Sequence, residues 1–341
     1  MQLVNTKQMA GMREGSIALA QVLAAVLLLF AASQGAAQEQ VSANASAADL
    51  DSFCDRLPRP AFAKLSKSQF SNDWFEVYEI EKGIWAIYEP FQWQEVISYL
   101  IVGDNMALLF DTGNGIGNIK AVIKKITAMP VIVINSHSHF DHIGGNYQFD
   151  NIASIATPFT IKNAKGSISA RVKREVSAAA LCRPLPEGIT RDNHHIRPFH
   201  ISRIISEGDI FDLGGRKLEL LRTPGHTEDS VALLDRDAGF LWSGDSFYEG
   251  PVWLFFPETD LYAYRQSMAR LARLAPRLKA VFPAHNTPRA DPALLIQASK
   301  NLELVLAGKV AGVGVMDGNV EFRFDRYSFL MRKDYHRLPP P

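Results

Sequence analysis

Short apolar runs bounded by turn residues predict most of the β-strands of this chain. A hairpin is expected over residues 73–90, because aromatic and β-branched residues stand on both sides of a turn at Lys82 and Gly83. Single strands are expected beyond it, and strand-like runs recur at short spacing between residues 201 and 242. The single strands cover residues 96–102, 106–110, 129–135, 152–156 and 319–330.

Apolar residues at helical spacing predict four helices among these strands. In residues 116–128, for example, three isoleucines and a valine stand at positions 119, 122, 123 and 126. The other helices are expected over residues 158–180, 261–274 and 291–310, whereas residues 182–200 are polar and proline-rich and have no periodicity. Because clusters of strands alternate with single helices in two similar halves, the pattern favours an α/β (α+β) fold of two mixed sheets, packed face to face with helices outside.

A dense group of potential metal ligands follows one of the predicted strands. The segment His137-Ser138-His139-Phe140-Asp141-His142 comes soon after the apolar run 131–134. Imidazole and carboxylate groups are the usual protein ligands of zinc and similar divalent ions. Alternate residues of an extended or looped segment can converge on one side, while His142 points elsewhere, so the spacing suggests two neighbouring metal sites.

Three further candidate ligands lie downstream, each after another strand-like run: His226, Asp245 and His285. Glycine or proline turns deliver them at strand ends, where a rigid scaffold can hold them as a metal site requires. With the first group they make seven candidate ligands, which suffice for two ions with open coordination positions.

This series of motifs resembles that of the metallo-β-lactamase superfamily, over roughly residues 74–290. His137-x-His139-x-Asp141-His142 is similar to the family's HxHxDH signature, and the three downstream ligands stand at its later ligand positions. The resemblance implies a four-layer αββα sandwich with the metal ions at one edge, where the two sheets meet. It implies that the first ion is held by His137, His139 and His226. The second ion would be held by Asp141, His142 and His285, and Asp245 would bridge the two.

The resemblance also assigns roles beside the ligands. Asp111, in Phe110-Asp111-Thr112-Gly113, resembles an aspartate that supports the metal loop from behind. Asp141 would orient the attacking hydroxide and carry its proton. Tyr248, three residues after Asp245, resembles a lactonase tyrosine that donates a hydrogen bond to the substrate, although packing within its own loop is the alternative.

An apolar loop over residues 249–257 follows Asp245 and predicts either a wall for an acyl chain or ring, or ordinary core packing. The stretch 243–257 is also loosely similar to the acyl-CoA thioesterases of the superfamily. The large side chains of the expected wall are those of Trp253, Leu254, Phe255 and Phe256.

The resemblance implies a dinuclear metal-dependent hydrolase that cleaves an acyl bond of a small molecule, an ester, lactone or thioester, with a metal-bridging hydroxide. One alternative is a periplasmic metallo-β-lactamase that hydrolyses β-lactam amides, and a second is a mononuclear iron oxygenase of the same fold. Zinc is the default for two divalent ions in this ligand set, while manganese, iron and cobalt also fit. A homodimer is left open.

Composition and charge are those of a globular protein with a sizeable core. The chain has 341 residues, of which 47% are hydrophobic and 21% are charged. Its 36 basic and 36 acidic residues balance, and the absence of a basic stripe argues against a nucleic-acid partner.

The N-terminus predicts a secretory signal peptide over residues 1–37, with Lys7 and Arg13 before an apolar stretch and small residues before a cleavage point after Ala37. An uncleaved membrane anchor is the alternative; no other segment predicts membrane contact. We therefore expect an exported protein, periplasmic or secreted.

A linker or extension (38–73), a catalytic domain (74–310) and a C-terminal segment packed on it (311–341) are expected to follow. Cys54 and Cys182 form a disulfide or remain free thiols.

Overall fold

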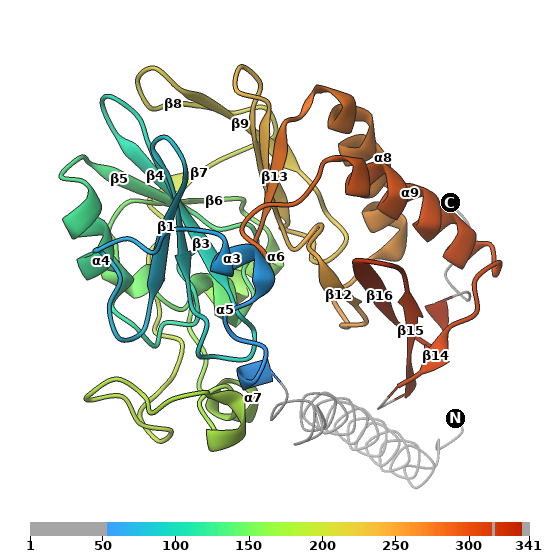
Figure 1. The fold of residues 1–341 in the computed structure, drawn as a ribbon, viewed down its shortest axis with the longest axis horizontal. Coiled ribbons are helices and arrows are strands. Elements are labelled where there is room, and N and C mark those ends of the chain that lie inside the picture. The colour runs from blue at the N-terminus through green and yellow to red at the C-terminus, as the bar shows by residue number, and fades with distance from the viewer. Residues whose placement is uncertain (1–52, 316–317, 336–341) are drawn as a thin grey trace, which may run out of the picture. The chain divides into compact units, whose positions relative to one another are not determined.

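The computed structural model describes residues 53–315 and 318–335, which form three β-sheets with helices packed around them (Figure 1). The predicted signal peptide and the first part of the predicted linker or extension lie outside the described residues. Within the described ranges, no helix combines the length and apolar character that crossing a membrane requires.

Seven strands form the first sheet, in their sequence order. β1 and β2 form the predicted hairpin, in which Gly83 takes a φ of 73° that suits glycine. Strands β1 to β4 pair antiparallel, and β5 to β7 extend the sheet in parallel. The strands are β1 (Glu76–Glu81), β2 (Ile84–Tyr88), β3 (Ile97–Val102), β4 (Ala107–Phe110), β5 (Val131–Ile134), β6 (Ile152–Ser154) and β7 (Arg203–Ile204).

Five strands form the second sheet, in the order β13-β11-β10-β9-β8. All its neighbours pair antiparallel except β11 and β13, which are parallel. Side chains from the inner faces of both sheets, such as Tyr99 and Trp242, share one buried cluster and hold the two sheets together. The strands are β8 (Ile210–Asp212), β9 (Lys217–Arg222), β10 (Val231–Asp235), β11 (Phe240–Gly244) and β13 (Ala280–Pro283).

Helices cover the outer faces of these two sheets. α4 (Ile119–Ile126) packs on the first sheet through its apolar face, and its first turn is capped by Asn118, whose side chain accepts from the N–H of Ala121. α8 (Leu261–Leu274) and α9 (Ala293–Leu306) pack on the second sheet. In Figure 1 the layers run from α4 through both sheets to α8 and α9. The predicted αββα sandwich is confirmed.

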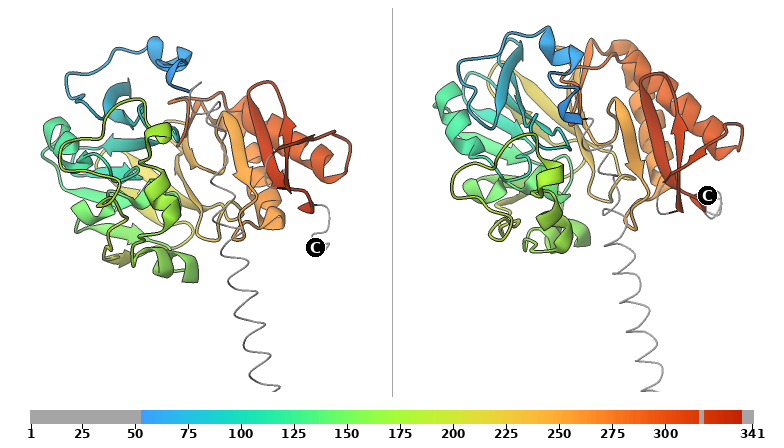
Figure 2. Two further views of the ribbon diagram at one scale, coloured as in Figure 1. Left: turned by 90° about the horizontal axis from the view of Figure 1, so that it is seen from below. Right: turned by 60° about the horizontal axis from the view of Figure 1, so that its bottom comes forward.

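A third sheet was not predicted. β12 (Gly250–Leu254) lies parallel to β16 (Tyr327–Arg332), which pairs with β15 (Asn319–Arg323), and β14 (Val313–Gly314) completes the sheet. The expected apolar loop is therefore partly a strand, and the strand predicted over residues 319–330 is a hairpin. The sheet packs with α8 and α9, and Figure 2 shows its red strands beside the orange helices.

The single long helix predicted over residues 158–180 is wrong. The segment forms α6 (Pro158–Asn163), α7 (Ala170–Arg174) and the short 3₁₀ helix η2 (Ala178–Ala180). Gly166 breaks the helix at a φ of 78°, and the backbone of the next residue, Ser167, pairs with Ile196 of the irregular segment. Pairing between distant segments thus outweighs local helical spacing here.

The predicted linker is folded from Phe53 onward. Cys54 and Cys182 form a disulfide, which joins the segment around α3 (Pro60–Ala63) to the residues that follow η2. Phe62 of α3 stacks on Tyr88 of β2, with 3.9 Å between the ring centroids. The remaining short helices are α5 (Phe140–Ile143), η1 (Asn146–Gln148) and η3 (Ala275–Arg277).

Candidate metal centre

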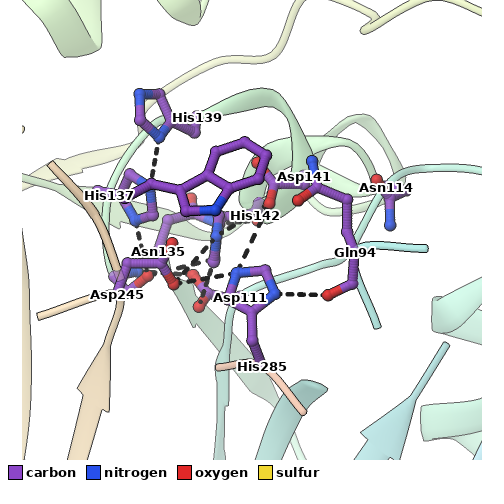
Figure 3. A network of polar contacts seen from close by, with 12 residues as sticks. Gln94, Asp111, Asn114, Asn135, His137, His139, Asp141, His142, Asp245 and His285 are labelled. Carbon is purple, nitrogen blue, oxygen red and sulfur yellow. Dashed lines mark hydrogen bonds and ion pairs between the residues drawn. The ribbon is translucent and has the colours of Figure 1, made fainter. Parts of the chain in front are cut away.

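All seven predicted ligands come together, and those labelled in Figure 3 lie close to one another. Four lie in the loop and short helix that follow β5, and the others follow β9, β11 and β13. Their side chains are between 0% and 7% exposed, so these polar groups are removed from bulk water. The seven are His137, His139, Asp141, His142, His226, Asp245 and His285.

Three imidazoles form the first group. Nε2 of His137 lies 2.9 Å from Nδ1 of His139, and Nε2 of His226 lies 3.1 Å from the same atom. One nitrogen of each ring lies within 4.8 Å of the other two. Three nitrogens this close can bind one ion in a tetrahedral arrangement that leaves a position open.

Two imidazoles and a carboxylate form the second group. Oδ2 of Asp141 lies 3.3 Å from Nε2 of His142 and 3.7 Å from Nε2 of His285. The ligand atoms of this group also lie within 4.8 Å of one another. This group offers a mixed nitrogen and oxygen set to a second ion.

Asp245 stands between the two groups. Its Oδ2 is 3.6 Å from Nε2 of His226, while its Oδ1 is 3.1 Å from Nε2 of His285 and 3.5 Å from Nε2 of His142. Oδ1 of Asp245 and Nε2 of His142 are buried without a hydrogen-bond partner among the described residues. Such buried polar atoms are costly unless something binds them, so the residues fit bound metal.

The outer nitrogens of three imidazoles are held by the protein. Nδ1 of His142 lies 3.0 Å from Oδ2 of Asp111, the aspartate that we expected to support the metal loop. Nδ1 of His226 lies 2.8 Å from the carbonyl oxygen of Trp253, and Nδ1 of His285 lies 2.7 Å from that of Gln94 (the latter contact is drawn in Figure 3). Because these oxygens can only accept, each Nδ1 donates its hydrogen to them and each Nε2 faces inward.

His139 is turned the other way. Its Nδ1 faces the first group, and its Nε2 lies 2.9 Å from Oε1 of Glu258. This contact lowers the pKa of Glu258 to about 2, against the opposing effect of burial. Sequence reasoning missed Glu258, because it lies 119 residues from its partner in no recognised motif.

Burial sets the charge of the first group. It lowers the pKa of His137 well below its usual value and lowers that of His226 to about 4. Both imidazoles therefore stay neutral near pH 7 and can offer a lone pair to a cation.

In the second group, facing charges outweigh burial. Burial alone would lower the pKa values of His142 and His285, but Asp141 and Asp245 raise both. Burial would likewise raise the pKa values of the two carboxyls, yet the facing imidazoles hold both below the usual range. The ionised carboxylates thus favour positive charge where the second ion would lie.

Tyr248 is buried beside the second group, with its ring centroid 5.0 Å from that of His285. Its hydroxyl oxygen accepts from the N–H of Trp253 at 3.3 Å, which leaves the phenol proton to be donated elsewhere. Burial raises its pKa well above the usual value, so the phenol keeps that proton.

Three of the four predicted wall residues form an aromatic group beside the first-ion ligands. The ring of Phe256 lies 5.1 Å from that of His139, and Phe255 and Trp253 pack beside Phe256. Leu254 does not belong to this group, because it packs in the cluster with α8 and α9. The alternation of side chains along β12 explains why neighbours in sequence separate.

Two charged residues of the segment after β6 also reach this region. The guanidinium of Arg171 lies 4.5 Å from the ring centroid of Phe256. Glu175 is buried, accepts from the indole N–H of Trp93 at 2.5 Å, and has its pKa raised by burial to about 7. Neither was predicted, because helical spacing over residues 158–180 does not show that either side chain reaches the ligands.

A family model described as Metallo-beta-lactamase superfamily matches residues 93–285. The match spans all seven ligands and Tyr248, and it begins after the hairpin of β1 and β2.

Among curated proteins, the acyl-coenzyme A thioesterase MBLAC2 of Gallus gallus is 28% identical over 229 residues, covering 62% of this chain and 81% of that protein. The hydroxyacylglutathione hydrolase of Methylococcus capsulatus is 26% identical over 210 residues, covering 58% of this chain and 68% of that protein.

Among solved structures, a metallo-beta-lactamase from Pontibacter korlensis matches with a TM-score of 0.50 and 20% identity, covering 67% of this chain and 99% of that one. The sec-alkylsulfatase Pisa1 from Pseudomonas sp. matches with a TM-score of 0.53 and 15% identity, covering 68% of this chain and 42% of that one. These structural likenesses show the fold.

Proposed function

This chain belongs to the metallo-beta-lactamase superfamily and is a hydrolase, and we propose that it cleaves thioesters at a centre of two divalent metal ions. The position of Asp245 carries the two-ion proposal, because its carboxylate places one oxygen beside each group of ligands. Thioester cleavage is supported by the names of the two curated relatives, an acyl-coenzyme A thioesterase and a hydroxyacylglutathione hydrolase.

We assign both ions as zinc, since imidazole and carboxylate ligands suit it, and manganese, iron and cobalt are the competitors. His137, His139 and His226 would hold one ion. The second group, with Asp245 as the bridge, would hold the other. When bound, the two ions supply a hydroxide nucleophile near neutral pH, by lowering the pKa of a shared water.

The protein's own groups then manage protons. Asp141 lies in the second group, where its carboxylate can accept the proton released as the new C–O bond forms. It can pass that proton to the sulfur as the C–S bond breaks, so the products are a carboxylate and a thiol. The hydroxyl of Tyr248 donates a hydrogen bond to the thioester oxygen as negative charge develops there, which stabilises the transition state by roughly 3 kcal/mol.

The aromatic group of Trp253, Phe255 and Phe256 would hold the acyl part of the substrate. These side chains lie beside the first-ion ligands and offer apolar surface to an acyl chain or ring. We assign the bond as a thioester and assign no thiol carrier, because thioesters of CoA and glutathione are mainly intracellular whereas we propose that this chain is exported.

We also propose export. The predicted signal peptide supports it, and so does the Cys54–Cys182 disulfide, because disulfides persist mainly in oxidising compartments.

The test measures metal content and turnover together, on purified protein that begins at Gln38. The substrates are acyl-CoA, acyl-glutathione, an acyl-homoserine lactone, a p-nitrophenyl ester and nitrocefin. We expect about two ions per chain and chelator-sensitive turnover of a thioester. Asp245→Asn should lose bound metal and turnover. Asp235 is a buried carboxyl paired with Arg216 outside the metal centre, so Asp235→Asn should keep bound metal and turnover. Turnover of nitrocefin or lactone without thioester turnover would refute the substrate assignment, and a single bound iron without turnover would refute the hydrolytic centre.

A further inference from the structure

The backbone carbonyl of Gln94 fixes the orientation of His285, at 2.7 Å from its Nδ1 (Figure 3). Gln94 lies in the loop between β2 and β3. The same loop is hydrogen-bonded along its backbone to the residues that follow β13. Val96 forms a β-bridge with His285, and the N–H of Asn286 donates to the carbonyl of Glu95. The position of the inward Nε2 of His285 therefore depends on the conformation of this loop.

Glu95, in this loop, has an unfavourable backbone conformation. Its φ is 49°, in the left-handed region that residues other than glycine rarely adopt. Its side chain is buried and accepts from Nε of Arg59 at 2.7 and 2.8 Å, and also from the hydroxyl of Tyr88. A buried carboxylate with these partners can compensate for the backbone strain.

Arg59 comes from the segment that the disulfide anchors. It directly precedes α3, which docks through the stacking of Phe62 on Tyr88. On the other side of the loop, the N–H of Cys182 donates to the carbonyl of Phe91 at 2.9 Å. The loop is thus clamped between the two segments that the Cys54–Cys182 bond joins. Arg59 lies outside the residues that the family model matches.

We propose that Arg59 and Glu95 are positioning residues of the metal centre. Their ion pair holds the carbonyl of Gln94 against His285, and so sets the affinity of the ion bound by the second group. This inference rests on the two-ion centre of the proposed function, but it does not depend on which bond the enzyme cleaves.

Zinc titration of metal-free protein against a competing chelator tests the proposal. His285→Ala identifies the binding step that belongs to the second group. In Arg59→Met we expect the affinity of that step to fall roughly 10–100-fold, as for other residues that orient a ligand from behind, while the other step is unchanged. Arg59→Lys keeps the charge but not the two-point contact, and should restore part of the affinity.

Two further variants separate positioning from general stability. Glu95→Gly tolerates the positive φ but removes the carboxylate, so it should weaken the same step as Arg59→Met. Arg289→Met is the matched control, because Arg289 pairs with Glu81 on the exposed side of the segment that follows His285; it should leave both steps unchanged.

The proposal would be overturned if folded Arg59→Met and Glu95→Gly bound zinc with wild-type affinity in both steps. It would also be overturned if the affinities of both steps fell equally and the melting temperature fell with them. If only the affinity of the second-group step fell, and the wild type did not cleave thioesters, the positioning role would be supported and the substrate assignment refuted. Binding of one ion by the wild type would overturn both.

Discussion

Every imidazole of the metal centre except that of His137 uses one ring nitrogen for a partner that only accepts, and turns the other inward. Carbonyl oxygens hold His226 and His285, and carboxylates hold His142 and His139. In His137 the outer nitrogen meets the hydroxyl of Ser136 at 3.1 Å. These partners hold the imidazole rings in their orientations before any ion arrives, which lowers the cost of organising the site on binding.

Glu89 gives a pH-dependent prediction at the residue scale. Burial raises its pKa to about 7, although hydrogen bonds from Trp74 and Asn114 favour the ionised form. Between its usual value of 4.5 and about 7, the folded protein retains a proton that the unfolded chain releases, so stability falls as pH rises through this range. In Glu89→Gln, the fall in the free energy of unfolding across this pH range should be smaller by roughly 3 kcal/mol. Urea unfolding at about pH 5 and about pH 8 measures it.

Glu187→Gln, at an exposed carboxyl, is the control for this titration and should leave the dependence as it is in the wild type. An unchanged slope in Glu89→Gln would show that other groups set the pH dependence.

The ligands could be predicted at this scale because a side chain such as His226 carries its own chemical signature in a recognisable motif. Their outer partners could not. Glu258 and Gln94 lie 119 and 191 residues from the histidines they hold, and Gln94 acts through a backbone atom that every residue possesses. Only the folded chain brings these groups together.

Between elements, the metal loop and the turn after β4 pack backbone against backbone. A side chain at Gly144 would place its Cβ 2.3 Å from the carbonyl carbon of Asn114. We expect Gly144→Ala to cost at least about 1–3 kcal/mol of stability, and to weaken metal binding because His142 lies in the adjoining turn. Thermal unfolding with and without chelator, followed by metal titration, measures both effects.

Gly314→Ala is the matched control, since a Cβ there meets open space and the φ is ordinary. Equal melting temperatures for the two variants would mean that the metal loop can move away from the turn without cost.

Apolar spacing located α4 and α8 because each buries one face against a sheet. It did not locate α6 and α7 as separate helices. Gly166 and the pairing of Ser167 with Ile196 divide them, and a pairing partner some thirty residues away leaves no mark on local periodicity.

At the scale of the molecule, the disulfide closes a long stretch of chain. Cys54 and Cys182 are 128 residues apart, so the bond restricts the unfolded state strongly. Replacing both residues with alanine should lower the free energy of unfolding by about 4–5 kcal/mol. Urea unfolding of both proteins measures it, and a reducing agent should weaken the wild type but not the variant. Equal unfolding midpoints before reduction would contradict the expectation.

The αββα layers could be predicted because family motifs mark the strand ends that meet at the seven candidate ligands. The third sheet could not, because β12 pairs in parallel with β16, and such pairing carries no turn signal between the partners. The apolar character of residues 250–254 fits a strand as well as a loop wall.

The pairing of β12 with β16 also fixes an order of events during synthesis. The carbonyl of Trp253 orients His226, and Trp253 lies in β12, which gains its parallel neighbour only when residues 327–332 have left the ribosome. The first group of imidazoles is therefore completed late, after nearly the whole described chain has been made. A chain exported before it folds would consequently take its ions from the compartment in which it folds, and the metal supply of that compartment would decide which ions the enzyme carries.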